Sequence, residues 1–179
     1  MTTSNSSHRA YARIAGFTFI FYIVAGIASL SLGDDAPIVN LLYFLQNLSA
    51  LVLGVTLYLL TREHGEALAL LALTCRIMEA VHDESATFFA VGSLLFCLLL
   101  LRGRVIPVGL AWLGVIASVL LVVILPLQLA GILTSEGWAS SATWMIWMPM
   151  LAFEVALALR LLVKGVSTQQ GSLMTQPAL

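Results

Sequence analysis

The sequence predicts an all-α integral membrane protein: a bundle of six transmembrane helices with both termini in the cytoplasm. Of the 179 residues, 60% are hydrophobic and only 9% are charged, and the mean hydropathy is +1.02, which is more than the surface of a soluble domain allows. A helix needs about 20 apolar residues to cross the hydrocarbon layer. Because lipid offers no partners to backbone polar groups, these long apolar runs favour a bundle of helices.

Six apolar segments are separated by short polar connections. The segments are expected at residues 14–32, 38–61, 66–82, 86–101, 105–133 and 142–163. Connections such as "GDDAP" and "HDES" leave no room for a soluble domain, so residues 14–165 are predicted to form one transmembrane domain. Residues 1–13 are expected to be a cytoplasmic tail, and the polar residues 166–179 a flexible C-terminal tail.

The distribution of positive charge predicts the orientation. With both termini cytoplasmic, all the Lys and Arg residues except Arg76 fall on the cytoplasmic side: Arg9, Arg13, Arg62, Arg102, Arg104, Arg160 and Lys164. Cytoplasmic loops retain positive charge, so a multi-pass protein of the inner (plasma) membrane is expected. The net charge of −1 indicates no basic surface for nucleic acid. The expected partners are the lipid bilayer and a lipid or small amphipathic ligand, and homo-oligomer formation is left open.

Three charged residues lie deep within the predicted spans: Arg76, Glu79 and Glu154. A charge near the bilayer centre costs about 2.5 to 3.5 kcal/mol even on a lenient insertion scale, so these residues are expected to face the bundle interior and to find partners. Arg76 requires a carboxylate, and either glutamate is close enough in depth to supply it. The sequence leaves this choice open.

Polar stripes at helical spacing extend this cluster to two more segments. The second segment places Tyr43 and Asn47 on one face, and the first places Thr18 and Tyr22 on one face. Together with the three deep charges, these stripes predict one polar interior. One interpretation is a set of interhelical contacts that fix helix register. The other is a cavity in which the arginine meets a ligand headgroup, or the two glutamates exchange a proton.

The favoured function is therefore the binding or transport of a small or amphipathic molecule at this cluster, with coupling to protons left open. The first alternative is a structural or assembly partner of another membrane complex. The second is an intramembrane enzyme or metal-binding protein, because Glu79 and His82 have the Glu-x-x-His spacing of two metal ligands and Asp83 is adjacent. A second such motif and the common catalytic motifs are missing from the sequence, so an enzyme is not favoured and no cofactor is assigned.

Four stretches resemble a known family. They are "RIAGFTFIFYIVAGI" at 13–27, "LYLLTREHGEALALLALTCRIMEA" at 57–80, "RGRVIPVGLAWLGVI" at 102–116 and "MLAFEVALALRLLVKG" at 150–165. This pattern is similar to domain of unknown function 4386 (DUF4386), small polytopic bacterial membrane proteins without an established activity. The resemblance implies the helical architecture, and it matches Arg76 and Glu79 to an Arg-x-x-Glu motif and Glu154 to a glutamate of the last span. The family typically has a longer region between its first two spans than "SLGDDAP" provides.

The charge distribution makes a prediction about topology. Single cysteines introduced at Ser6 and Gly137 are expected to differ in labelling by a membrane-impermeant thiol reagent applied to intact cells, because the positively charged side stays in the cytoplasm. Gly137→Cys should be labelled and Ser6→Cys should be labelled only after lysis. The opposite pattern would reverse the orientation.

Overall fold

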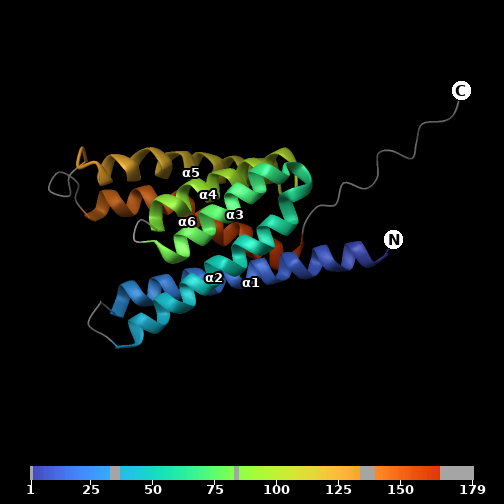
Figure 1. Ribbon diagram of the computed structural model, residues 1–179, viewed down its shortest axis with the longest axis horizontal. Coiled ribbons are helices and arrows are strands. Elements are labelled where there is room, and N and C mark those ends of the chain that lie inside the picture. Colours follow the sequence, from blue (N-terminus) through green and yellow to red (C-terminus); the bar gives the residue numbers. More distant parts are fainter. Residues whose placement is uncertain (1, 33–36, 83–84, 134–139, 166–179) are drawn as a thin grey trace, which may run out of the picture.

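The computed structural model describes residues 2–32, 37–82, 85–133 and 140–165. Throughout these ranges the structure is helical, with short turns and no strand (Figure 1). The helices are α1 (Thr2–Leu32), α2 (Pro37–Thr61), α3 (Glu66–Val81), α4 (Ser85–Arg102), α5 (Val108–Leu129) and α6 (Ser140–Val163), with a short 3-10 helix at Arg62–His64. This confirms the predicted all-α class.

The helix boundaries differ from the predicted segments mainly at two places. α1 begins at Thr2, so part of the predicted N-terminal tail continues the first helix. α5 is shorter than the predicted segment 105–133, because Pro107 precedes its first residue and Gly131, with a φ of 70°, lies just after its end. The predicted C-terminal tail at 166–179 lies outside the described residues.

Four of the six helices are long and apolar enough to cross a membrane. They are α1 from His8, α2 together with the 3-10 helix, α5, and α6 from Trp144. The apolar part of α4, Ala86–Arg102, is shorter, and α3 has only 16 residues and contains Arg76 and Glu79. Length and composition therefore support a membrane protein, but they do not confirm the prediction of six spans.

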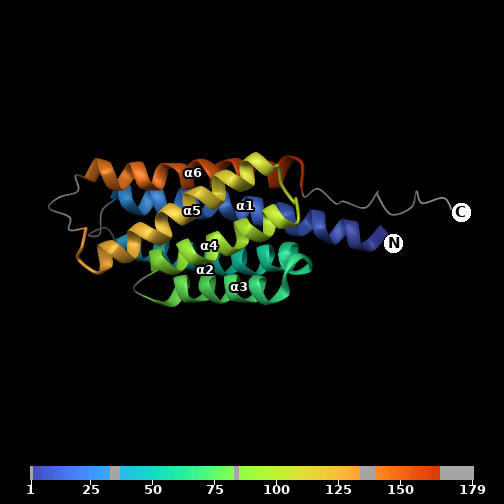
Figure 2. The same cartoon turned by 90° about the horizontal axis from the view of Figure 1, so that it is seen from above.

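Consecutive helices alternate in direction and pack against one another in chain order. α6 also packs against α1, which closes the six helices into a ring, and Figures 1 and 2 show the start of α1 and the end of α6 at the same end of the bundle. The α2–α3 and α4–α5 connections, with Arg62, Arg102 and Arg104, also lie at this end. The fold thus gathers these cations at one end, as the sequence predicted.

Close packing at that end and separation at the other define the shape of the bundle. A Cβ atom on Gly16 of α1 would lie 2.8 Å from the carbonyl oxygen of Ala158 in α6 and 2.8 Å from Cγ of Leu162. The two helices therefore contact each other through their backbones, as small residues allow in membranes. Towards the opposite end, the α1–α2 hairpin diverges from the other helices (Figure 1). This divergence creates the space in which the deep polar residues lie.

The close contact at Gly16 predicts that a single methyl group destabilises the bundle. In Gly16→Ala the new Cβ must displace the backbone of α6, and overpacking of this kind costs about 1 to 3 kcal/mol. The control is Gly109→Ala in α5, where a Cβ would meet nothing within 4 Å. Thermal unfolding in detergent should show a lower Tm for Gly16→Ala only. Equal Tm values for both variants would disprove the backbone contact.

Candidate functional site

Arg76 forms an ion pair with Glu79 one turn further along α3. Its Nη1 donates a hydrogen bond of 2.8 Å to Oε2 of Glu79. The side chains of Arg76 and Glu79 are only 2% and 5% exposed. Of the two carboxylates that the sequence offered to this arginine, the structure therefore pairs it with Glu79. In a low-dielectric environment, pairing and hydrogen bonding are what make a buried charge tolerable.

Neighbouring helices complete the surroundings of Arg76. From α4, Ser93 accepts a hydrogen bond of 3.0 Å from Nη2, and the Phe89 ring lies under the guanidinium carbon, 4.8 Å from the ring centroid, which is a cation–π geometry. From α2, Gly54 makes room, because a Cβ there would lie 2.9 Å from Cβ of Arg76. Arg76 is thus enclosed between α2 and α4.

Glu79 connects this pair to the first helix. Tyr22 of α1 donates a hydrogen bond of 2.8 Å from its hydroxyl group to Oε1 of Glu79, while Oε2 accepts from Arg76. Both carboxylate oxygens therefore have strong donors, and one network joins α1, α3 and α4. The structure thus brings three of the predicted cluster residues together: Tyr22, Arg76 and Glu79.

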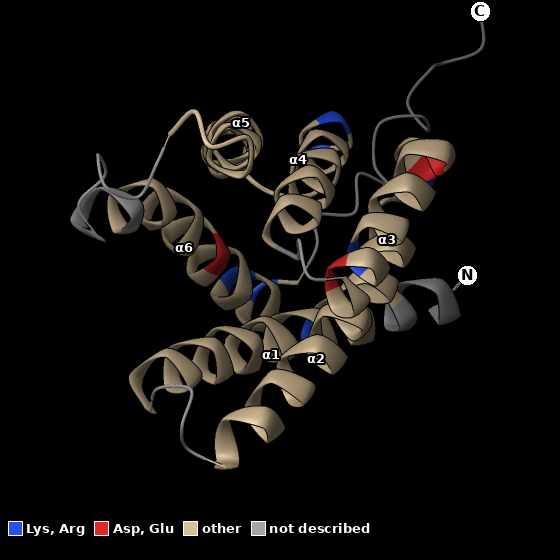
Figure 3. Cartoon of the chain, turned by 60° about the vertical axis from the view of Figure 1, so that its left-hand side comes forward, with Lys and Arg blue, Asp and Glu red and all other residues tan. Residues whose placement is uncertain are grey.

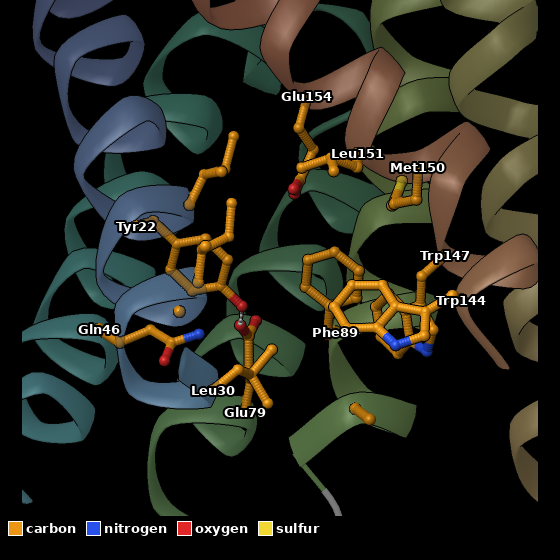
Figure 4. Close-up of a pocket in the computed structure, with 14 residues that line it drawn as sticks. Tyr22, Leu30, Gln46, Glu79, Phe89, Trp144, Trp147, Met150, Leu151 and Glu154 are labelled. Carbon is orange, nitrogen blue, oxygen red and sulfur yellow. Dashed lines mark hydrogen bonds between the residues drawn. The ribbon is translucent and has the colours of Figure 1, made fainter. Parts of the chain in front are cut away.

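A cavity of about 610 Å³ lies beside the network. Its polar lining consists of Tyr22, Gln46, Glu79 and Glu154. Three aromatic side chains contribute to the wall (Figure 4): Phe89, Trp144 and Trp147. The rest of the lining is aliphatic or small: Ile23, Gly26, Ile27, Leu30, Ala86, Met150 and Leu151. Arg76 does not belong to the lining that the described residues provide, so the cavity presents carboxylates rather than the guanidinium group.

Glu154 is the carboxylate that the network leaves out. It lies on α6, is 5% exposed, and its Oε1 is buried without a hydrogen-bond partner among the described residues. Figure 4 shows its carboxylate and that of Glu79 pointing into the cavity from different helices, and Figure 3 shows the acidic positions of α6 and α3 on either side of the bundle interior. An unpaired buried carboxylate normally costs stability.

The cavity reaches the surface of the bundle between α1 and α6. Ile27 and Leu30 of α1 and Trp144 of α6 line it, and each of these side chains is at least half exposed. All three lie away from the end at which Gly16 joins the same two helices. The opening is therefore rimmed by apolar side chains on the outer surface of the bundle.

Two of the predicted site residues lie elsewhere. Tyr43 is 40% exposed, the Asn47 side chain is exposed, and neither lines the cavity as the described residues define it. Gln46 occupies the inward position of α2, where Gly26 of α1 leaves space for its amide. One residue along a helix is a rotation of about 100°, so Tyr43 and Asn47 point away from the cavity that Gln46 lines.

Ser93, Phe89 and the two lining tryptophans are site residues that the sequence prediction missed. Ser93 had a detectable signal, since it is a small polar residue within the otherwise apolar run of α4. Phe89, Trp144 and Trp147 had none, because aromatic residues are equally expected in a core or facing lipid. Their place in the site depends on how α4 and α6 pack.

The alternative of a metal site at Glu79, His82 and Asp83 is not supported by the positions of the described residues among them. Glu79 is engaged by Arg76 and Tyr22, and the His82 ring packs edge-on against Phe88, with centroids 5.3 Å apart. Asp83 lies outside the described residues. Within the part of the chain that the structure describes, no group of three His, Cys, Asp or Glu side chains is arranged to hold a metal ion.

The chain was compared with known protein families, curated proteins and solved structures. Residues 81–165 match the model of domain of unknown function DUF4386. This match, over 85 of the 179 residues, supports the resemblance predicted from the sequence. The DUF4386 match covers α4, α5 and α6 and includes Glu154, whereas Arg76 and Glu79 precede it. No curated protein and no solved structure matches the chain.

The ion pair predicts a specific pattern of stability. Arg76→Met keeps much of the side-chain volume but leaves Glu79 buried without its cation, which should cost roughly 3 to 5 kcal/mol. The double variant Arg76→Met/Glu79→Gln removes both charges and should regain part of this loss. Ile77→Ala, at an exposed neighbouring position, is the control and should unfold near the wild-type Tm. If Arg76→Met and Ile77→Ala melt alike in detergent, the buried pair does not stabilise the fold.

Proposed function

We propose that this protein is an integral membrane protein that binds a small amphipathic molecule in the cavity between α1, α3, α4 and α6. The observation that carries the proposal is the combination of a cavity of about 610 Å³ with a buried, unpartnered carboxylate, Glu154, that faces it. Ligand sites are typically concave, of about 300 to 1,000 Å³, and mostly apolar with a few polar groups that fix orientation. The lining has this composition.

A structural role accounts for only part of the site. The Arg76 network has the form of an interhelical connection, because hydrogen bonds link its members across α1, α3 and α4. Only Nε of Arg76 is buried in it without a hydrogen-bond partner among the described residues. Such contacts fix register in membrane bundles. Glu154 makes no comparable contact through its buried Oε1, so an assembly or scaffold function leaves its burial unexplained. A ligand explains it.

The proposed setting is the inner membrane, with six spans and both termini in the cytoplasm. α3 supports this, although it is short, because its two buried charges, Arg76 and Glu79, face inward. Aliphatic side chains such as Leu70, Leu71 and Ile77 are exposed on its other face. A helix with this distribution is suited to lipid on one side and to a paired polar interior on the other. The gathering of cations at one end supports the orientation.

The position of the opening supports an amphipathic ligand. Its rim, formed by Ile27, Leu30 and Trp144, lies on the surface that would face lipid, so a molecule dissolved in the bilayer reaches the cavity without crossing water. Its apolar part would contact the aliphatic wall and its polar group would reach Glu154 and Gln46. Both carboxylate and amide groups hydrogen-bond readily with such a headgroup.

Transport would require access to this site to change. Pro149 lies within α6, five residues before Glu154, and a proline in a helix removes one backbone hydrogen bond and permits a kink. Bending of α6 at this point would move Glu154 relative to α1. Binding would then extend to transport, with the two glutamates as the groups that exchange a proton or a ligand.

Filling the cavity tests the proposed binding. Native mass spectrometry of protein purified in a mild detergent should reveal a bound small molecule or lipid. Ala86→Phe, on the cavity wall, should lose it because the added ring occupies the space, while Val123→Phe, on the exposed face of α5, should retain it. Comparable Tm values for the two variants would show that both fold. A wild-type protein without a bound molecule, or an Ala86→Phe variant that keeps it, would contradict the proposal.

A further inference from the structure

We propose that the ligand is an organic cation with an apolar body, and that its charged group lies against Glu154. This inference rests on the proposed binding function and specifies its substrate class. It follows from the distribution of charge in the cavity, from the aromatic side chains around it, and from the position of Arg76 behind the lining.

The charges around the cavity do not balance. Arg76 contributes +1, while Glu79 and Glu154 contribute −1 each, so the ionised set sums to −1. Arg76 is hydrogen-bonded to Glu79, and the remaining Lys and Arg side chains that the structure describes are partly or fully exposed. Glu154 therefore lacks a protein cation in contact with its buried Oε1. Since an uncompensated charge in a low-dielectric interior is costly, a cationic ligand would stabilise the ionised carboxylate.

Aromatic rings beside the carboxylates favour the same ligand class. Phe89 and Trp147 lie with ring centroids 5.7 Å apart, and Tyr22 is parallel to Phe89 at 6.4 Å. The negative faces of aromatic rings attract alkylated ammonium groups. These groups are weakly hydrated, so their transfer from water into the cavity has a small desolvation cost. Phe89 already contacts the guanidinium group of Arg76 in this way. A second cation in the cavity would meet Trp147, Tyr22 and Glu154.

An anionic ligand is disfavoured by the same geometry. The sequence allowed Arg76 to meet an anionic headgroup, but its Nη atoms are directed to Glu79 and Ser93, and its side chain is 2% exposed. A phosphate or carboxylate in the cavity would instead lie near Glu79 and Glu154, where like charges repel. Arg76 therefore positions Glu79 through its guanidinium group and does not itself contact the ligand.

Matched pairs of ions with opposite charge test this assignment. The probes are tetraphenylphosphonium against tetraphenylborate, and the smaller phenyltrimethylammonium against benzenesulfonate, titrated into the detergent-purified protein. Trp144 and Trp147 line the cavity, so tryptophan fluorescence reports occupancy. In at least one pair the cation should bind about tenfold or more tightly than the anion, since the Coulombic attraction between unlike charges in a low-dielectric site is large enough for at least one factor of ten.

Variants at Glu154 connect the preference to this residue. Glu154→Gln preserves the shape and should reduce cation affinity about tenfold while leaving the anion unchanged, and Glu154→Asp should retain part of the preference. Glu66→Gln makes the same chemical change at an exposed position at the start of α3 and should leave both affinities unaltered. Thermal unfolding checks that all the variants are folded.

Several results would overturn the inference. These are failure of both cations to bind, an anion that binds as tightly as its matched cation, or a cation affinity unchanged in Glu154→Gln. If a neutral or anionic molecule still co-purifies with the wild type and is lost in Ala86→Phe, the proposed binding function survives and only the cation assignment fails. If no molecule co-purifies and no probe binds, both fail.

Discussion

The cost of placing a full positive charge inside a membrane bundle governs much of this structure. Arg76 can occupy its position only because three helices supply what the lipid cannot: Glu79 on its own helix, Ser93 and the Phe89 ring on α4, and the space left by Gly54 on α2. Each of these contacts restricts the rotation of a helix about its axis. The hydroxyl group of Tyr22 extends the restriction to α1. The register of four helices thus follows from one charge.

The contacts described for α5 and α6 are close packing contacts at glycines, whereas α1 to α4 meet around Arg76. This contrast distinguishes the structural part of the interior from the candidate site. A Cβ on Gly114 of α5 would lie 2.6 Å from the Phe153 ring of α6, and a Cβ on Gly16 of α1 would lie 2.8 Å from the backbone of α6. Glu154 lies on α6, outside the hydrogen-bonded network of Arg76, Glu79, Tyr22 and Ser93. The paired carboxylate is therefore fixed by the fold, whereas the unpaired one is available to a ligand.

The sequence predicted those features that depend on local composition and on the cost of burying charge. Apolar runs located the six helices. Arg76 and Glu79 marked the interior face of α3, because a charged side chain that faces lipid has a high free-energy cost. The choice of Gln46 over Asn47 was not predictable, since it depends on the rotation of α2 against α1 at Gly26. The cavity could not be predicted from the sequence either, because it results from the divergence of two helical hairpins and not from any single segment.

The cavity itself is easier to maintain in this setting than in a soluble protein. In water, separating α1 from α6 would expose apolar surface to solvent, with a free-energy cost proportional to the exposed area. In a bilayer the side chains at the opening, Ile27, Leu30 and Trp144, contact lipid whether the helices are apart or together, so the cost is mainly the loss of close packing. An apolar molecule that enters between these helices restores the lost contacts. Under the proposed function, the aliphatic wall and Glu154 would therefore act on different parts of a ligand: the wall would stabilise its apolar body, and Glu154 would select its headgroup.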